Sequence, residues 1–211
     1  MKKLLLIAAT FITTFAFSQS EMYTKKMKQN LQLLDSAKSA QDFIDLSASF
    51  QRVGDAEKTQ WLPYYYAAYA NYMTGWIDPK ADKDKVGAKS TDLLAKAEAL
   101  ETNNSEIFCM KQMIAVQEMT VDAMNRWQTY GKEATAALEN AKKADPTNPR
   151  PYMLDGQTVM NTPEAFGGGK ANAKPLLQKA VDLFATFKPA SELHPSWGKK
   201  TAEDLLAQCS K

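Results

Sequence analysis

The sequence predicts an all-α protein in which helix pairs stack side by side as an α-solenoid. Apolar residues recur every three or four positions along nearly the whole chain, and no segment has a convincing strand pattern. A longer repeat accompanies this periodicity, because Tyr64, Phe108 and Tyr152 lie 44 residues apart. A repeat of this length is typical of folds in which each helix pair packs mainly on its neighbours.

The N-terminus has the pattern of a secretory signal peptide. A basic start and an apolar run over residues 4–17 lead to small residues around Ser18. The run is shorter than the ~20 residues of a membrane-spanning helix, which disfavours a membrane anchor. We therefore expect a signal peptide over residues 1–18 and a single helical domain over residues 19–211. No second long apolar run follows, so we expect no stable membrane insertion after cleavage.

The first two helices are expected between residues 21 and 53. Apolar side chains recur at helical spacing over residues 21–37. Ser39 stands three positions before Asp42, which is the spacing of a capping box and predicts the start of the second helix. Gly54 predicts the end of that helix, because glycine is common just after a helix.

The next helix, residues 61–76, is the most aromatic part of the chain. Five of its aromatic residues are spaced by four, four, three and four positions, so they share one face. They are Trp61, Tyr65, Tyr69, Tyr72 and Trp76. Large aromatic side chains usually supply core area, which favours packing against the following helices. The alternative is that the stripe lines a concave groove, and these five residues are then the candidates for binding a partner.

Residues 77–89 interrupt the apolar pattern with charged residues. Asp78, Asp82 and Asp84 do not have the spacing of a calcium-binding loop, which needs further ligands and a terminal glutamate. We expect a solvated loop here, followed by a helix over residues 90–100.

Small and apolar residues mark where the paired helices should touch. Ala134, Leu138 and Ala141 are spaced by four and three positions, and the same spacing recurs in the neighbouring units. Helix axes approach to about 8–10 Å only where the side chains at the crossing allow it. The predicted packing positions are Ala97, Ala134, Leu138, Ala141, Pro146, Ala173, Leu177 and Ala180.

This pattern resembles the second helix of a tetratricopeptide repeat (TPR), a helix-turn-helix unit of about 34 residues. The turn over residues 145–149 supports the resemblance, since Asn148 can cap the next helix and Pro149 suits its first position. The observed period near 44 residues exceeds that of the family and approaches that of HEAT-like repeats. The resemblance implies about three to four TPR-like units and a binding scaffold, and it names no ligand.

A second block strengthens the resemblance. The segment P-E-A-F-G-G, residues 163–168, precedes Ala173 and Leu177 in the order found in secreted bacterial TPR-like proteins. Together with the short leader, it favours a secreted or periplasmic protein of a Gram-negative bacterium. The glycines that follow Phe166 resemble a phosphate-binding loop only superficially, because Glu164 and Ala171 occupy two required positions.

The C-terminal tail contains the only histidine, His194, in the segment E-L-H-P-S-W-G. One histidine cannot form a triad together with a metal site, and no obvious partner is near it in the sequence. Trp197 is expected to pack on the last helix pair. Residues 201–208 predict a final helix that caps the array, as solenoids require.

Charge and motifs exclude several classes of protein. Without the leader, the chain has 24 Lys and Arg residues and 24 Asp and Glu residues, so its formal charges balance. It therefore lacks the basic excess of a nucleic-acid binder. Catalytic sequence motifs such as Gly-x-Ser-x-Gly, His-Glu-x-x-His and Cys-x-x-Cys are absent. Methionines at residues 110–124 could bind copper or a variable apolar partner, but methionine also commonly fills gaps in a hydrophobic core. We expect no catalytic residue, metal site or cofactor.

The two cysteines, Cys109 and Cys209, lie 100 positions apart in different expected helices. Export permits a disulfide. Units of a solenoid contact mainly their neighbours, however, so the two residues need not meet. We favour two buried or half-buried thiols and keep the disulfide as the alternative.

Three functions remain open at this point. The first is an exported, non-enzymatic scaffold that binds a protein or peptide partner in its concave groove, as the resemblance implies. The second is a periplasmic binding protein for a small molecule or a cell-wall fragment, with an aromatic-walled pocket and a transporter as partner. The third, an enzyme on a helical scaffold, is disfavoured by the missing motifs. An open aromatic groove would favour the first function, and a closed pocket the second.

Overall fold

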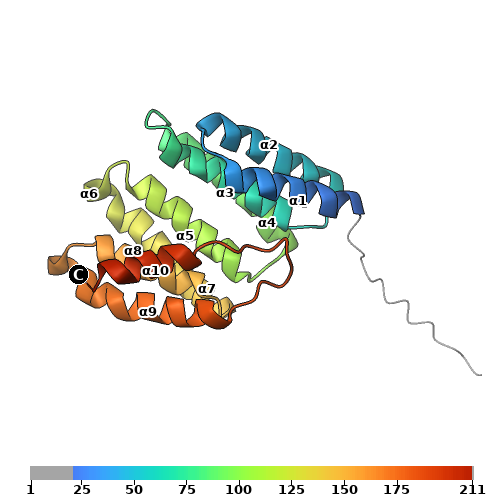
Figure 1. Cartoon of the computed structure of the whole chain (residues 1–211). Coiled ribbons are helices and arrows are strands. Elements are labelled where there is room, and N and C mark those ends of the chain that lie inside the picture. Colours follow the sequence, from blue (N-terminus) through green and yellow to red (C-terminus); the bar gives the residue numbers. More distant parts are fainter. Residues whose placement is uncertain (1–20, 211) are drawn as a thin grey trace, which may run out of the picture.

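The computed structural model describes residues 21–210, and it is helical over this range with no strand in it (Figure 1). The all-α prediction is therefore confirmed. The expected signal peptide lies outside the described residues. Between residues 21 and 210, no helix combines the length and the apolar character needed to cross a membrane.

The chain folds into ten α-helices within the described range, together with one π-helical and one 3-10 turn. The helices are α1 (Glu21–Ser36), α2 (Ala40–Glu57), α3 (Leu62–Ile77), α4 (Lys83–Leu100), α5 (Ser105–Met119), α6 (Ala123–Arg126), α7 (Lys132–Ala144), α8 (Arg150–Asn161), α9 (Lys170–Thr186) and α10 (Lys199–Gln208). The turns are η1 (Trp127–Gly131) and η2 (Glu164–Phe166).

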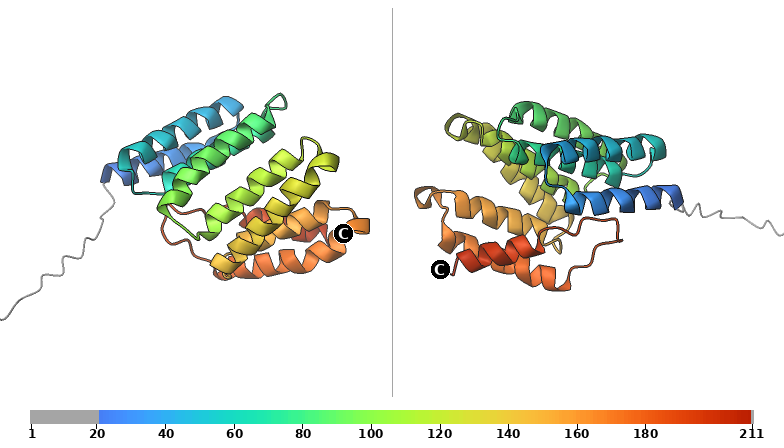
Figure 2. Two further views of the ribbon diagram at one scale, coloured as in Figure 1. Left: turned by 180° about the vertical axis from the view of Figure 1, so that it is seen from behind. Right: turned by 45° about the horizontal axis from the view of Figure 1, so that its top comes forward.

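Three helix pairs form most of the molecule: α3 with α4, α5 with α7, and α8 with α9. The first helices of these pairs are neighbours, since α5 contacts both α3 and α8. Helices α1 and α2 precede the pairs, and α2 packs along α3. At the other end α10 packs on α8 and α9 (Figure 2). A long connection from α9 to α10 passes close to the N-terminal helices before it returns.

Polar contacts between successive pairs follow the period of the sequence. Arg150 at the start of α8 bonds to Glu106 at the start of α5, which is 44 residues earlier. Asn148 donates to Ser105, 43 residues earlier. Residues in equivalent positions of neighbouring pairs therefore face each other.

The core divides into two clusters of buried side chains. The first joins α1 to α5 and includes Phe50, Tyr65 and Leu94. The second joins α5 to α7, α8, α9 and α10 and includes Leu138. Met113 of α5 is half-buried and packs against both clusters, so α5 links the two halves of the molecule.

The residues expected at helix contacts lie inside, with one exception. Ala97, Ala141 and Ala180 are fully buried on α4, α7 and α9, the second helices of the three pairs. The other helical positions of the set, Ala134, Leu138, Ala173 and Leu177, are also buried. Pro146 is exposed in the turn before α8, where its carbonyl accepts a hydrogen bond from the Tyr152 hydroxyl at 3.3 Å.

Two sequence-based helix boundaries were wrong in detail. Helix α4 begins at Lys83 instead of residue 90, because the Asp82 side chain accepts a hydrogen bond from the Lys85 amide and caps a polar first turn. Helix α2 continues past Gly54, where a Cβ would lie 2.8 Å from the Tyr64 ring, so this glycine permits close packing and does not end the helix.

The expected start of the second helix is confirmed, and α5 begins with a cap of a related kind. Ser39 and Asp42 form a capping box, with the Asp42 amide donating to Ser39 Oγ at 3.1 Å and the Ser39 amide donating to the Asp42 carboxylate at 2.9 Å. The Asn104 side chain accepts hydrogen bonds from the Glu106 and Ile107 amides in the first turn of α5, which is the usual role of a residue just before a helix.

Candidate functional site

The aromatic stripe of α3 does not lie in one continuous environment. Tyr65 is fully buried and Tyr72 is 9% exposed, whereas Trp61 and Tyr69 are half-buried. Trp76, at the end of the helix, is 44% exposed and has the Lys83 ammonium 4.4 Å from its ring centre. The regular spacing places these side chains on one face, but different neighbours cover different parts of that face.

Part of this face is covered by residues 187–198, the connection between α9 and α10, which we call the strap. The Trp197 indole N–H donates to the Tyr65 hydroxyl at 3.0 Å, and its ring stacks on Tyr69 with centroids 6.2 Å apart. The His194 ring meets the Trp61 ring edge-on at 5.8 Å. We call these five residues, which join α3 to the strap, the aromatic seam: Trp61, Tyr65, Tyr69, His194 and Trp197.

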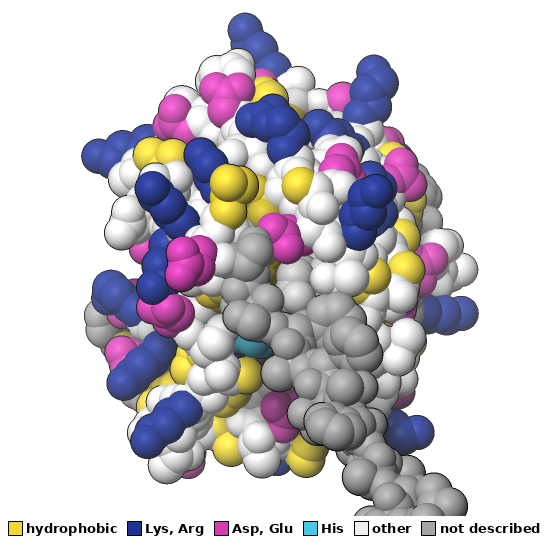
Figure 3. Space-filling view, turned by 90° about the vertical axis from the view of Figure 1, so that its right-hand side faces the viewer, with side chains coloured by type: hydrophobic (Ala, Val, Ile, Leu, Met, Phe, Trp, Pro, Cys, Tyr) yellow, Lys and Arg dark blue, Asp and Glu magenta, His cyan; other side chains and the backbone are white. Residues whose placement is uncertain are grey.

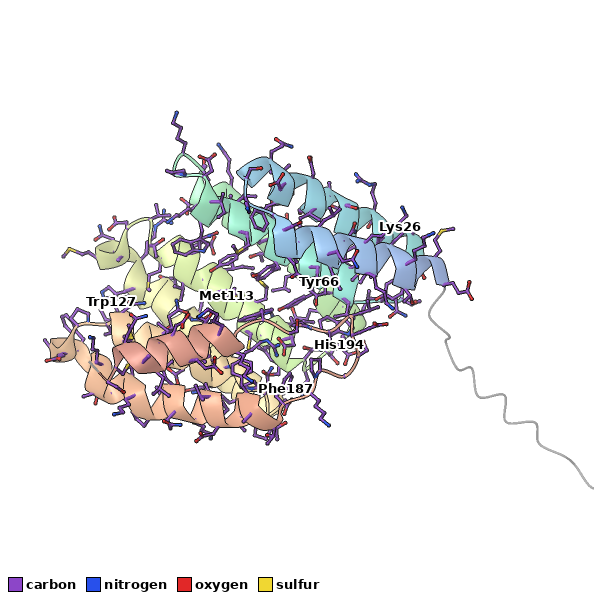
Figure 4. The ribbon with its side chains drawn as sticks, in the orientation of Figure 1. Lys26, Tyr66, Met113, Trp127, Phe187 and His194 are labelled. Atoms are coloured by element: carbon purple, nitrogen blue, oxygen red, sulfur yellow. The ribbon has the colours of Figure 1, made fainter. Side chains whose placement is uncertain are left out.

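Three contacts hold the strap to the helices around His194. The Tyr66 hydroxyl of α3 donates to the Leu193 carbonyl at 2.9 Å, and the Arg150 guanidinium donates to the Pro195 carbonyl. Glu192 forms an ion pair with Lys28 of α1 at 2.6 Å, although both side chains are largely in solvent. Figure 4 shows Tyr66 of α3 near the part of the strap that carries His194. The residues on both sides of the histidine are therefore fixed.

Arg150 is a fully buried arginine at the base of the strap. Its guanidinium donates to the Glu106 carboxylate at 2.8 Å and lies 5.1 Å from the ring centres of both Phe187 and Trp197. Burial raises the pKa of Glu106, while Arg150 and the Asn148 amide act in the opposite direction. The charged pair thus ties α5 and α8 to the strap in a site that excludes most of the solvent.

His194 is half-buried, and part of its ring can be seen at the molecular surface (Figure 3). Its Nδ1 atom lies 2.8 Å from Ser191 Oγ, within hydrogen-bonding distance. Burial lowers the pKa of the imidazole, and the Glu101 carboxylate opposes this shift. The ring is therefore mainly neutral at neutral pH, and it is the only imidazole in the chain.

Two surface grooves lie away from the aromatic seam. One of about 410 Å³ lies between α4, α5 and α7 and exposes the carboxylates of Glu98, Glu118 and Glu133. The other, also about 410 Å³, lies between α1 and α2 beside Asp42 and Asp45. Carboxylates outnumber cations in both linings, with Lys111 in the first groove and Arg52 in the second, so neither groove favours an anionic ligand. Over residues 21–210, no three His, Cys, Asp or Glu side chains gather closely enough to hold a metal ion by themselves.

The sequence identified one side of the seam and missed the other. Trp61, Tyr65 and Tyr69 were among the five candidates on α3. Trp197 was expected to pack on the last helix pair, but it also reaches α3, while His194 was given no partner. The tail is dense in aromatic and turn-forming residues, and this density was the available sign that it packs on the helices. The sequence pattern could not show that the tail packs on α3, more than a hundred residues earlier.

Comparison with solved structures shows a protein of similar fold over nearly the whole chain. The fold is similar to that of the HusA haemophore from Porphyromonas gingivalis, with a TM-score of 0.81 and 34% sequence identity. The alignment covers 90% of this chain and 94% of that chain. No family model and no curated protein matches the sequence. The likeness extends over the helix pairs and fits a binding protein.

Proposed function

Because this chain belongs to the same family as the HusA haemophore, we propose that it is an exported protein that binds haem. The observation that carries the proposal is 34% identity over nearly the full length of both chains. A haemophore is by definition a carrier of haem. The proposal therefore selects the small-molecule alternative of the sequence analysis over a peptide in an open groove.

We place the haem at the aromatic seam. Haem is a flat, largely apolar ring system with two carboxylates at one edge, and binding sites for such molecules combine aromatic surface with a few polar groups. Trp61, Tyr69 and Trp197 are all half-buried, so each can offer part of its ring to a ligand. The two grooves each have more carboxylates than cationic side chains in their lining, which disfavours the haem carboxylates there.

The test is a titration of the mature protein with haemin, followed by the Soret absorbance. Replacing Tyr69 and Trp197 by alanine is expected to weaken haem binding by about tenfold or more, because a loss of ~1.4 kcal/mol of contact energy has this effect. The control is Trp127→Ala, which removes an exposed tryptophan in η1, outside the seam. If the double variant keeps its fold and binds haem as the parent does, the seam is not the site.

A protein partner is the second candidate function, favoured by exposed apolar side chains at the end of α3 and in the segment that follows α5. Trp76, Ile77, Met124 and Trp127 are between 39% and 87% exposed, and large apolar side chains in solvent often mark interaction surfaces. A pull-down from a periplasmic fraction should compare the parent with a Trp76→Ala, Trp127→Ala variant. Equal recovery of the same partner by both proteins would rule out this surface as the binding site.

Two further expectations stay proposals. We infer that the helix pairs are TPR-like, supported by the buried alanines and the 44-residue period of the polar contacts. We also infer that the protein is not an enzyme, supported by the missing catalytic motifs of the sequence. Haem would then be cargo that the protein holds and releases unchanged.

A further inference from the structure

We propose that the groove between α1 and α2 binds a short peptide of two or three residues, with its free amino terminus at Asp45 and its free carboxylate at Arg52. This groove is separate from the aromatic seam, and the inference does not depend on haem binding. Its basis is the volume of the groove, the order of the charges along α2 and a buried amide group without a hydrogen-bond partner.

The groove lies where α1 and α2 run side by side (Figures 1 and 2). Its volume of about 410 Å³ is within the range of about 300–1,000 Å³ that small-molecule sites have. Leu33 and Leu46 give the lining an apolar part, whereas serines and charged residues make the rest polar. An apolar surface with a few polar groups is the usual composition of a site for a small organic molecule.

The polar side chains of the groove are ordered along one face of α2. Asp45, Ser49 and Arg52 are four and three positions apart, so they lie in one row. The row runs from a carboxylate through a hydroxyl to a guanidinium, and this length of helix spans about 10 Å. An extended peptide of three residues is also about 10 Å long, with an ammonium at one end and a carboxylate at the other. The charges of such a peptide therefore complement both ends of the row.

Both charges at the ends of the row are available to a ligand. Asp45 and Arg52 are exposed, and neither forms an ion pair with a residue between 21 and 210. The only hydrogen bond of the Asp45 carboxylate within this range comes from the Gln41 side chain at 2.9 Å, so one oxygen is free. Asp42 lies at the same end, but its carboxylate is already engaged in the capping box of α2. A guanidinium can bind a carboxylate through two parallel hydrogen bonds, which suits Arg52 to the end of a peptide.

Asn30 of α1 provides a polar group between the two charges. It lines the groove, is 5% exposed, and its carboxamide oxygen accepts a hydrogen bond from Ser49 Oγ at 3.0 Å. Its amide nitrogen is buried and has no hydrogen-bond partner among residues 21–210. Buried polar groups are nearly always hydrogen-bonded, so an unpaired amide in the wall of a groove indicates a ligand with an acceptor. The peptide carbonyl between the two termini is such an acceptor.

Other small ligands match this lining less well. A simple anion would meet the carboxylates of Asp42 and Asp45, and a simple cation would leave Arg52 unpaired. A single amino acid carries both charges, but they are attached to the same carbon and cannot reach both ends of the row. The lining therefore selects a molecule whose two opposite charges are several ångströms apart.

The test is a titration of the 15N-labelled mature protein with the tripeptide Ala-Leu-Ala, followed by the shifts of its amide signals in NMR spectra. The same titration uses the N-acetylated tripeptide, the tripeptide with a C-terminal amide, and free leucine. We expect the unblocked tripeptide to shift signals of α1 and α2. Each blocked form should bind about threefold to fivefold more weakly because it lacks one ion pair, and leucine about tenfold or more weakly.

Two variants assign the ends of the peptide. Arg52→Gln should weaken binding of the unblocked tripeptide about threefold to fivefold and leave the C-terminal amide unaffected, because that form has no terminal carboxylate. Asp45→Asn should weaken the unblocked tripeptide equally and leave the N-acetylated form unaffected. Both side chains are exposed, so the variants should keep the fold. The matched control is Glu133→Gln, which removes an exposed carboxylate from the other groove.

The alternative outcomes each contradict a different part of the proposal. A parent protein that does not bind Ala-Leu-Ala would overturn the site. Equal affinities for the unblocked and blocked forms, or for leucine and the tripeptide, would overturn the pairing of both ends. Variants at Arg52 and Asp45 that bind the unblocked tripeptide as the parent does would show that any bound peptide lies elsewhere. None of these results changes the haemin titration, so the haem-binding function is tested separately.

Discussion

At the scale of single residues, Arg150 has the most consequential position in the molecule. It is fully buried, pairs with Glu106, and contacts the strap through a carbonyl and two aromatic rings. Breaking a buried ion pair by removing one partner leaves an uncompensated charge, which typically costs about 3–5 kcal/mol. This burial could not be predicted from the sequence, because an arginine after Asn-Pro has the pattern of an exposed residue at a helix start.

We predict that Arg150→Met destabilises the protein by about 3–5 kcal/mol at neutral pH and by less near about pH 4. Burial already raises the pKa of Glu106 above its ordinary value of 4.5, and Arg150 opposes that rise. Without the guanidinium, the folded-state pKa rises further above the unfolded value. The folded variant then binds the proton more tightly than the unfolded chain does, so its stability falls as the pH rises from about 4.5. Urea unfolding at several pH values measures this.

The matched control is the double variant Glu106→Gln, Arg150→Met, which removes both charges. It should show the smaller loss of stability and lack the additional dependence on pH. If the single and double variants respond to pH in the same way, the Glu106 carboxylate is not the group responsible.

At the scale of helices, the second helix of each pair packs through alanine. Ala141 of α7 has no exposed surface, and its carbonyl accepts a hydrogen bond from Ser105 Oγ of α5 at 2.9 Å. The spacing of small residues marked this position from the sequence alone. The spacing was informative because only small side chains fit where two helices approach closely, and they recur at the helical period.

We expect Ala141→Trp to destabilise the protein by roughly 1–3 kcal/mol or more, because the added ring must displace the side chains of a close-packed contact. Thermal unfolding measures the effect. Ala136→Trp on the same helix is the control, since Ala136 is exposed and should tolerate the larger side chain. Equal melting temperatures for the two variants would show that α7 does not pack through Ala141.

The helix boundaries were harder to predict where the helix carried no apolar stripe. The first turns of α4 are mostly polar, so the sequence suggested a loop, but the Asp82 cap begins the helix seven residues earlier than expected. Gly54 was interpreted as a terminator because glycine often ends helices. Its role depends on the Tyr64 ring from the following helix, which a local pattern cannot show.

At the scale of the whole molecule, the fold class could be predicted and the arrangement of the site could not. Periodicity identifies helices, because each buried side chain repeats with the helical turn. The seam depends on contacts between residues separated by 127 and 132 positions, and no spacing rule links such residues. The sequence therefore predicted the stripe on α3 but not that the strap covers part of it.

The cysteines provide a test of the whole fold. Both are free: Cys109 is fully buried, and Cys209 is half-buried with its sulfur 3.8 Å from that of Met160. Burial raises the pKa of the Cys109 thiol, which further lowers its reactivity. We expect a thiol reagent to label one cysteine in the native protein and two after denaturation. Cys209→Ser should abolish the native labelling, and failure of both cysteines to react after denaturation without reductant would indicate a disulfide.

The strap also affects the order of events in biosynthesis. Its contacts with α3 join early and late parts of the chain, so the Tyr65–Trp197 and Tyr66–Leu193 bonds cannot form until almost all residues are available. A polypeptide crossing a membrane N-terminus first would deliver α3 long before the segment that completes the seam. If the seam binds haem, as proposed above, such a protein takes up haem only after leaving the translocation machinery. A nascent chain stalled before residue 187 would then have no assembled binding surface.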